Sequence, residues 1–461
     1  MPVDVLSPPA RPALSGRARL TLLVLCAAQF VVTLDFSILN VALPALGSDL
    51  GMGRAGLQWA VTAFALPSGG LLLLFGRLAD RYGRRRLFLL GLGVFTAASV
   101  LVTLAPDAAS FLAGRALQGV AAALIVPTGM ALLTTSFPEG PLRERALGIS
   151  GTLLSLGYTT GMVLGGVMTD ALGWRSTMGL LAVAGLGVLL LSSAVPAPSR
   201  VPRPARPDVP GAVTVTGGLL CLVYALSSAA QRGFGDADVV VALAAGLGLL
   251  AAFAVAESRV ADPLVPLSML RRRTVAWGNL GGLATVSTMT ALIFLLTLYL
   301  QDVLGLSAFR TGLLFGVQGL FAAFAGMTAS RVVARFGARR VLVGSLLFQA
   351  VATAPLVWLG TGPAAAWAAL AAASAGVVGN LWAVVAYGVT ATSGAPDDEQ
   401  GLATALVTSA QQLGTTVGIP VVGVVVPGWG LRGAMGLDAV VVALAGLGVA
   451  LGLRGGARRA E

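Results

Sequence analysis

The residues that could do chemistry in this chain are one acid and one base set inside long apolar runs. Asp35 is the one acid that we place within a helix, and Arg115 is the one base so placed. A charge at the centre of a bilayer costs about 2.5–3.5 kcal/mol on insertion scales, so such residues are usually functional. Burial favours the neutral form of a carboxyl group, whereas a neighbouring guanidinium favours the ionised form. Moving the two residues relative to one another would therefore load and unload a proton on Asp35.

The depths of these two residues predict that they meet. Asp35 lies about 22 Å along its helix from one membrane face, at 1.5 Å per residue. Arg115 lies about 8 Å from the opposite face, and thus also about 22 Å from the first face of a core about 30 Å thick. Two interpretations follow: a protonatable acid gated by an arginine, or a static structural ion pair.

The elements that must position this pair are membrane-spanning helices. Of the 461 residues, 56% are hydrophobic and only 11% are charged, whereas soluble domains carry about 25% charged residues. Only helices and closed barrels satisfy their backbone in a bilayer, and the period-two alternation of barrel strands is missing. We expect an all-α polytopic protein with fourteen apolar segments of about 20 residues or more. They run over about 20–46, 57–76, 87–105, 110–136, 147–169, 176–195, 211–230, 239–256, 274–300, 310–330, 341–360, 364–392, 402–427 and 433–453.

These segments group into two bundles of six helices with an extra pair between them. A stretch rich in Pro and Arg separates the first bundle from the pair, and such a stretch cannot lie inside a helix. The alternative has twelve spans, with the pair peripheral to the bilayer. The expected organisation is an N-terminal tail (1–19), a first bundle (20–195), a linker (196–210), the extra pair (211–256), a loop (257–273), a second bundle (274–453) and a C-terminal tail (454–461).

The arginines predict the orientation. With fourteen spans, 24 of the 30 basic residues fall on the side of both termini, and five fall on the other side. Because basic residues concentrate in cytoplasmic loops, both termini should be cytosolic, in a bacterial inner membrane. The net charge of +11 therefore reflects topology and not nucleic-acid binding.

An internal repeat supports two related bundles. Gly76–Arg86 and Ser330–Arg340 lie 254 residues apart, and Arg, Arg, an aromatic residue, Gly, Arg and Arg recur in register. Repeated halves around a site at the middle of the membrane are the architecture of many secondary transporters.

Five motifs together resemble the major facilitator superfamily, and specifically its fourteen-helix drug:H+ antiporter subfamily. The resemblance implies the major facilitator fold, multidrug efflux by alternating access, and protons as the coupling ion, with Asp35 and Arg115 in the motifs of the first and fourth helices. The motifs are Leu34–Pro44, Gly76–Arg86, Arg115–Gly119, Pro263–Leu267 and Gln411–Gly414.

The Gly76–Arg86 motif could act as a latch. Asp80 among five arginines can hold a charge network at the membrane edge, and two glycines permit tight turns and close approach. The resemblance implies that this network joins the two halves on the cytosolic side, although the second copy has Ala334 in place of the acid. The alternative is a basic loop that only fixes orientation. The latch candidates are Gly76, Asp80, Arg81, Gly83 and Arg84.

A glycine face resembles the antiporter motif of the fifth helix. Gly157, Gly161 and Gly165 recur every four residues, with Gly166 beside them, and such spacing allows close helix packing. The family pattern usually has Pro where this chain has Met162. The alternative is tight packing without any meaning for the direction of transport.

Polar or aromatic residues inside other segments are candidates for a substrate cavity, because sites for amphiphiles are mostly apolar with few polar groups. Each could instead form an interhelical hydrogen bond or anchor an interface. They are Gln29, Phe64, Gln118, Tyr158, Asn279, Gln318, Asn380 and Trp382.

Composition excludes several classes of protein. The chain has no His and no paired intramembrane acids, which argues against an enzyme, and no His-based metal site. The leading hypothesis is a monomeric, proton-coupled exporter of hydrophobic or amphiphilic drugs or natural products, with no cofactor and no metal. A symporter or uniporter for a small metabolite would need more polar groups in its site, and a receptor or sensor is the remaining alternative.

Overall fold

The computed structural model describes residues 16–137, 140–195, 209–260, 267–362, 364–393 and 400–453, and these residues form helices and turns without strands. The prediction of an all-helical chain is confirmed for this part of the protein. Most of the predicted linker, both tails beyond these limits, the acidic loop at 397–399 and the proline motif at 263–266 lie outside the described residues.

The helices alternate with short turns along the whole chain. The first group comprises α1 (Gly16–Asp49), α2 (Arg54–Gly70), α3 (Leu72–Tyr82), α4 (Arg84–Thr103), α5 (Ala108–Ser136), α6 (Pro141–Leu172), α7 (Trp174–Leu191) and the short η1 (Ser192–Ala194). Two helices follow, α8 (Val209–Arg232) and α9 (Ala237–Glu257). The last group comprises α10 (Leu267–Leu270), α11 (Arg273–Leu298), η2 (Tyr299–Val303), α12 (Ala308–Phe336), α13 (Ala338–Thr353), η3 (Ala354–Trp358), α14 (Ala364–Thr392), α15 (Gln400–Gly423) and α16 (Val426–Leu453).

Many of these helices are long and apolar enough to cross a membrane. Among the described residues, eleven helices meet that requirement, and α2 with α3 would form a twelfth as one bent span. α8 contributes only a shorter apolar stretch, Val213–Ala229. The protein is therefore a polytopic membrane protein, as its composition predicts.

The second predicted segment is not one straight helix. α2 and α3 meet at an angle of 51°, and the break follows Pro67 by one turn. A proline inside a helix removes a backbone hydrogen bond and favours a kink. The prediction that the segment ends at residue 76 is wrong: helix α3 continues to Tyr82, so Gly76 and Asp80 are helical and the turn itself is at Gly83.

The repeat in sequence is also a repeat in structure. α3 ends at Tyr82 and is followed by Gly83 with φ +105°, and α12 ends at Phe336 and is followed by Gly337 with φ +84°. Both angles lie in the left-handed region that only glycine adopts readily, which explains why glycine stands at both turns. In each copy an arginine stacks on the following aromatic ring, with Arg81 5.6 Å from Tyr82 and Arg335 5.5 Å from Phe336.

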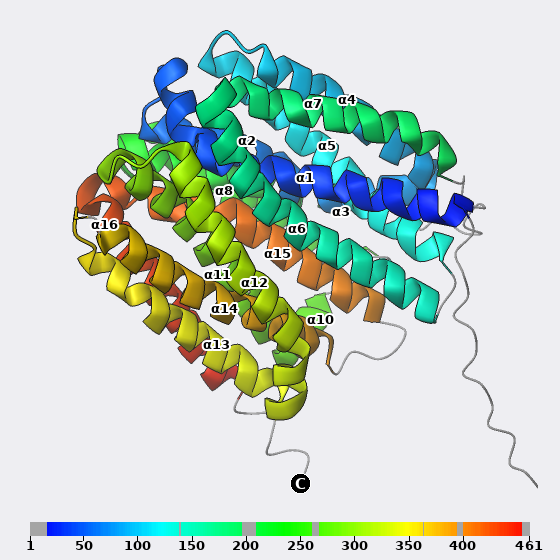
Figure 1. Ribbon diagram of the computed structural model, residues 1–461. Helices are drawn as coiled ribbons and strands as arrows, with labels where there is room; N and C mark the ends of the chain where they lie inside the picture. The colour runs from blue at the N-terminus through cyan, green and yellow to red at the C-terminus, as the bar shows by residue number, and fades with distance from the viewer. Residues whose placement is uncertain are drawn as a thin grey trace, which may run out of the picture.

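The helices form two groups that follow the chain order. α1 packs on α6 and α4 on α5 in the first group, whereas α11 packs on α15 and α13 on α14 in the second. Figure 1 shows the first group in blue to green and most of the second in yellow to red, on opposite sides of the molecule. α9 packs on α8, which in turn lies against α2 and α15. We call the side where α1 begins and α16 ends the terminal side, and the opposite side the distal side.

The two groups are joined at the distal side. Gly166 near the end of α6 packs on α12, where an added Cβ would lie 2.5 Å from the carbonyl oxygen of Ala308. The backbone N–H of Phe309 donates to Asp170 Oδ2 at 3.0 Å, and Gln301 Nε2 donates to the carbonyl of Val41 at 2.9 Å. These contacts bridge the seam between the halves at that side.

Candidate functional site

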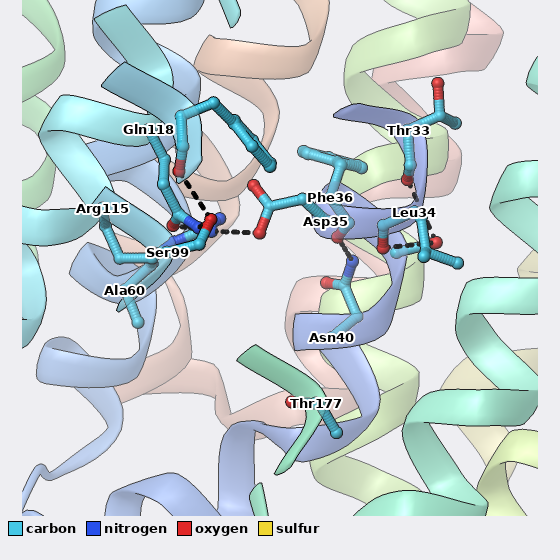
Figure 2. A network of polar contacts seen from close by, with 12 residues as sticks. Thr33, Leu34, Asp35, Phe36, Asn40, Ala60, Ser99, Arg115, Gln118 and Thr177 are labelled. Carbon is cyan, nitrogen blue, oxygen red and sulfur yellow. Dashed lines mark hydrogen bonds and ion pairs between the residues drawn. The ribbon is translucent and has the colours of Figure 1, made fainter. Parts of the chain in front are cut away.

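A buried ion pair joins the two residues that the sequence singled out. Arg115 Nη1 on α5 donates to Asp35 Oδ1 on α1 at 2.6 Å, and both side chains are fully buried. Figure 2 shows the carboxylate and the guanidinium facing one another between the two helices. The prediction that Asp35 and Arg115 lie at the same depth and meet is therefore confirmed.

The arginine is held by more than the acid. Its Nη1 also donates to Gln118 Oε1 at 2.7 Å, its Nε donates to the carbonyl of Ala60 at 3.3 Å, and its Cζ lies 4.6 Å from the centre of the Phe64 ring. These contacts fix the guanidinium from α2 and from its own helix, so its position does not depend on Asp35 alone.

The ion pair leaves two polar atoms unsatisfied. Asp35 Oδ2 and Arg115 Nη2 are buried without a hydrogen-bond partner. The pair is therefore a single contact and not the bidentate fork that makes arginine–carboxylate pairs strong. A buried carboxylate with one free oxygen can accept a proton there without first breaking another bond.

A polar chain continues from the pair toward α4. Gln118 Nε2 donates to Ser99 Oγ at 2.9 Å, and Ser99 Oγ donates to the carbonyl of Phe95 at 2.7 Å. Figure 2 shows Ser99 and Gln118 beside Arg115. Ser99 was not predicted as a site residue, because a serine in an apolar run gives no signal by itself in one sequence.

Glycines bring the surrounding helices close to the pair. A Cβ on Gly119 would collide with the carbonyl of Phe64 and approach Pro67 Cγ to 2.7 Å, so this glycine lets α5 meet α2 beside the arginine. Close approach of helix backbones at small residues is the usual means of packing within membranes.

The predicted glycine face of α6 packs against the helix that carries Asp35. A Cβ added at Gly157 would lie 3.1 Å from the carbonyl oxygen of Phe30. A Cβ added at Gly161 would collide with Ser37 Oγ, and one added at Gly165 would lie 2.7 Å from the carbonyl oxygen of Ile38. α1 is thus held closely by α6, whose neighbouring Gly166 faces α12 instead.

The predicted latch residues pair within their own motif. Asp80 Oδ1 accepts from Arg84 Nε at 2.9 Å and from its Nη2 at 2.8 Å. Arg81 stacks on Tyr82, and a Cβ on Gly76 would only touch Pro127 at 3.9 Å. Among the described contacts, no hydrogen bond or ion pair runs from Asp80 to the second half.

The cavity candidates of the first half are scattered. Phe64 and Gln118 belong to the polar cluster around the ion pair. Gln29 Oε1 accepts from Ser150 Oγ at 3.4 Å, joining α1 to α6. Tyr158 is half-buried on α6 and packs against the apolar core. The structure therefore brings two of these four residues to the ion pair.

The cavity candidates of the second half mostly bond within that half. Four side-chain nitrogens donate hydrogen bonds: Asn279 Nδ2 to the Val275 carbonyl at 2.9 Å, Gln318 Nε2 to the Ala373 carbonyl at 3.3 Å, Asn380 Nδ2 to the Thr285 carbonyl at 2.8 Å, and Trp382 Nε1 to Thr328 Oγ1 at 3.0 Å. Gln318 also lines a cavity of about 10 Å³, which is large enough for about one water molecule and too small for a drug.

Asn380 belongs to a second polar cluster, which the sequence did not reveal. Asn380 Nδ2 donates to Thr285 Oγ1 at 3.1 Å, Thr285 Oγ1 donates to Gln349 Oε1 at 2.8 Å, and Gln349 Nε2 donates to Thr288 Oγ1 at 3.0 Å. The cluster joins α11, α13 and α14, which stand in the second half where α1, α4 and α5 stand in the first. The charged cluster of the first half thus has a neutral counterpart.

The expectation that Asp35 is the one acid inside a helix is wrong. Asp438 lies within α16 and is only 2% exposed. Glu257 at the end of α9 is 3% exposed. Asp438 falls inside the last predicted segment, so the sequence alone contained the signal.

Comparisons with known proteins agree with this architecture. The family model described as Major Facilitator Superfamily matches residues 25–418. The chain is 40% identical to the cephamycin export protein CmcT of Amycolatopsis lactamdurans, over 92% of this chain and 88% of that protein. It is 37% identical to the puromycin resistance protein pur8 of Streptomyces alboniger, over 88% of this chain and 81% of that protein.

More distant similarities extend this pattern. The tetracenomycin C resistance and export protein of Streptomyces glaucescens is 31% identical, over 89% of this chain and 76% of that protein. The fold of the POT family transporter PepTSo superposes with a TM-score of 0.74 over 97% of this chain and 99% of the other, at 15% identity. At that identity the second similarity concerns the fold alone.

Proposed function

The chain belongs to the Major Facilitator Superfamily, and we propose that it exports hydrophobic or amphiphilic antibiotics by proton-coupled alternating access. It is a transporter and not an enzyme. The relatives in cephamycin export and in puromycin and tetracenomycin C resistance support this substrate class. Their hosts include Streptomyces and Amycolatopsis, so a role in antibiotic resistance or self-resistance is proposed.

The observation that carries the proposal is the buried Asp35–Arg115 pair, with its free carboxylate oxygen. Coupling needs a group whose protonation changes as the two halves move. Protonation of Asp35 removes the charge that attracts Arg115, while Gln118 and the Ala60 carbonyl still hold the guanidinium. A proton on Asp35 therefore favours separation of α1 from α5, and its loss favours the pair.

The direction of access follows from the seam between the halves. The contacts near Asp170 and Gln301 join the halves at the distal side. In the proposed orientation both termini are cytosolic, because the arginine-rich turns after α3 and α12 lie on the terminal side. The structure then represents a state closed toward the outside.

We propose fourteen spans in the bacterial plasma membrane. To the twelve counted by length and composition, this adds α8 and α15, each 24 residues long. α8 and α9 would be an extra pair beside the seam, since α8 lies against both α2 and α15. A proton is the proposed coupling ion, a monomer is the proposed unit, and neither a cofactor nor nucleic acid is involved.

A symporter or uniporter for a small metabolite is the rival. It would need several convergent polar groups, but most of the polar candidates already bond to backbone carbonyls or to side chains of the helices that carry them or lie beside them. A receptor or sensor would bind without moving its ligand across the membrane.

The test is a resistance and efflux screen in a host lacking its own pumps, with a panel of amphiphilic antibiotics. An exporter should raise resistance and lower intracellular drug, and a protonophore should abolish both effects. Purified protein in vesicles should then move the same compounds when a pH gradient is imposed. Binding without movement would indicate a receptor, and accumulation inside cells would indicate a symporter.

A further inference from the structure

A second buried carboxyl group lies in the other half of the protein, on α16. Asp438 is 2% exposed. Both of its oxygens are buried without a hydrogen-bond partner, and no ion pair includes it among the described residues. It differs in this from Asp35, whose charge is balanced by an arginine.

The surroundings of Asp438 on α16 are apolar. It shares one face of the helix with Leu431, Ala434, Met435 and Val442, which lie three, four or seven residues away and are all buried. Three- and four-residue spacing places side chains on one face of a helix, and here that face is packed inside the bundle. The acid therefore occupies a core position.

No neighbouring charge balances this acid. The elements packed against α16 are α8, α11, α13, α15 and η3, and α15 and η3 carry no titratable group. Among the residues that the structure describes, no hydrogen bond or ion pair joins Asp438 to any charged or titratable group of the others, of the adjacent η2 or of α16 itself. These groups are Cys221, Tyr224 and Arg232 on α8, Arg273 on α11, Tyr299 and Asp302 in η2, Arg339 and Arg340 on α13, and Arg432 on α16.

Asp438 is closer to the distal side than Asp35. It follows the helix kink at Gly430 by eight residues, about 12 Å along the axis. Asp35 precedes the distal end of α1 at Asp49 by 14 residues, about 21 Å. The two acids thus lie in different halves and at different depths, so each can exchange a proton separately.

The neutral polar cluster of the second half lies nearby. α16 runs antiparallel to α13 and η3: Gly446 packs on Leu346, and Gly436 packs on Val357. Along these helices, Gln349 of the cluster lies between Leu346 and Val357, and Asp438 lies between Gly436 and Gly446. Along the helix axes, the polar cluster therefore begins within about one or two helical turns of the level of the acid.

We propose that Asp438 is a second proton-binding carboxyl group of the transport cycle. The proposal rests on the proposed function, because it concerns how many protons are exchanged per molecule exported. An ionised carboxylate without partners in an apolar environment is strongly disfavoured. Asp438 therefore holds its proton in this state, which is closed at the distal side.

The proton balance is simple. Asp438 takes one proton from water when the distal side opens, keeps it while the halves close, and gives that same proton to water on the terminal side. No covalent bond other than O–H forms or breaks. With Asp35, two protons move inward for each substrate molecule that moves outward.

The first test needs no substrate. Infrared difference spectra of the purified full-length protein, recorded as the pH is changed, report the carbonyl band of protonated carboxylic acids. A band present in the wild type and in Asp35→Asn should be missing in Asp438→Asn. Asparagine resembles the neutral acid in size, so the variant should fold. Retention of every such band in Asp438→Asn would overturn the proposal.

The second test counts protons. In proteoliposomes with a fixed driving force of 100 mV, removing one coupled proton lowers the steady-state gradient of an exported neutral compound by about 50-fold. Asp438→Asn and Asp35→Asn should each show that loss, and the double variant should accumulate nothing. Asp107→Asn, an exposed helix cap, is the matched control and should behave as wild type.

The outcomes separate the two claims. If the wild type accumulates no compound under a pH gradient, the proposed function fails, while the infrared experiment still reports whether Asp438 carries a proton. If the wild type is coupled and Asp438→Asn keeps the wild-type gradient, Asp438 is a structural acid and this inference is wrong.

Discussion

Replacing Asp35 with asparagine keeps the shape of the side chain and removes the group that can exchange a proton. The Oδ1 atom of asparagine can still accept from Arg115 Nη1, which lies 2.6 Å from the acid in the native pair. The guanidinium also keeps Gln118 and the Ala60 carbonyl as acceptors. The variant should therefore insert and fold, with a charged arginine that has lost its counter-ion.

General energetics set the size of two effects of this substitution. Removing one partner of a buried ion pair costs about 3–5 kcal/mol, and this is an upper limit because asparagine retains an acceptor. One proton entering down 100 mV supplies about 2.3 kcal/mol, and about 1.4 kcal/mol corresponds to a factor of ten. Asp35→Asn should therefore lower the steady-state gradient of a neutral substrate by about 50-fold.

The assay is uphill transport in proteoliposomes with an imposed pH gradient, measured together with substrate-induced proton release. Downhill movement and binding of neutral compounds should survive in Asp35→Asn. Combining Asp35→Asn with Arg115→Gln should recover thermal stability in detergent, because no buried charge then remains unpaired. Wild-type uphill transport by Asp35→Asn would refute the assignment of this residue as a coupling site.

Three further predictions address topology, the latch and helix packing. A reporter fused at Asp236, in the turn between α8 and α9, should be extracellular; a cytosolic signal would mean that this pair does not span the membrane. Asp80→Asn should lower transport without preventing insertion, as measured by efflux per membrane-inserted molecule, and normal efflux would leave the motif with a role in topology alone. Gly161→Ala should destabilise the protein by about 1–3 kcal/mol or more because its Cβ would collide with Ser37 Oγ, whereas Gly148→Ala on the same helix meets nothing within 4 Å and should be neutral; equal melting temperatures for the two variants would contradict the packing described for α6.

The amino-acid composition and the apolar runs were enough to predict the class of protein and most of its helices. Apolar runs are local, and each must satisfy its backbone within the bilayer, so composition and length predict a helix at each run. The glycines after α3 and α12 were also readable, because a turn with positive φ needs glycine wherever it occurs. Asp35 and Arg115 stood out because charge inside an apolar run is costly.

What those residues touch depends on how the helices pack in three dimensions. The pairing of Asp35 with Arg115 agreed with their estimated depths, but depth says nothing of rotation about a helix axis. Rotation and close packing placed Ser99 and Phe64 at the same site. They also placed Asn380 in the neutral polar cluster of the second half, where it bonds to Thr285 and does not line a substrate cavity.

Asp80 and Asp438 show the same limit of prediction from sequence. Asp80 was expected to bridge the halves, and the structure pairs it with Arg84, the first residue of α4, across the turn at Gly83. Asp438 was not predicted as a site residue, although it lies near the start of the last apolar run. Its burial and its lack of partners are properties of five packed elements, and no single segment of sequence contains them.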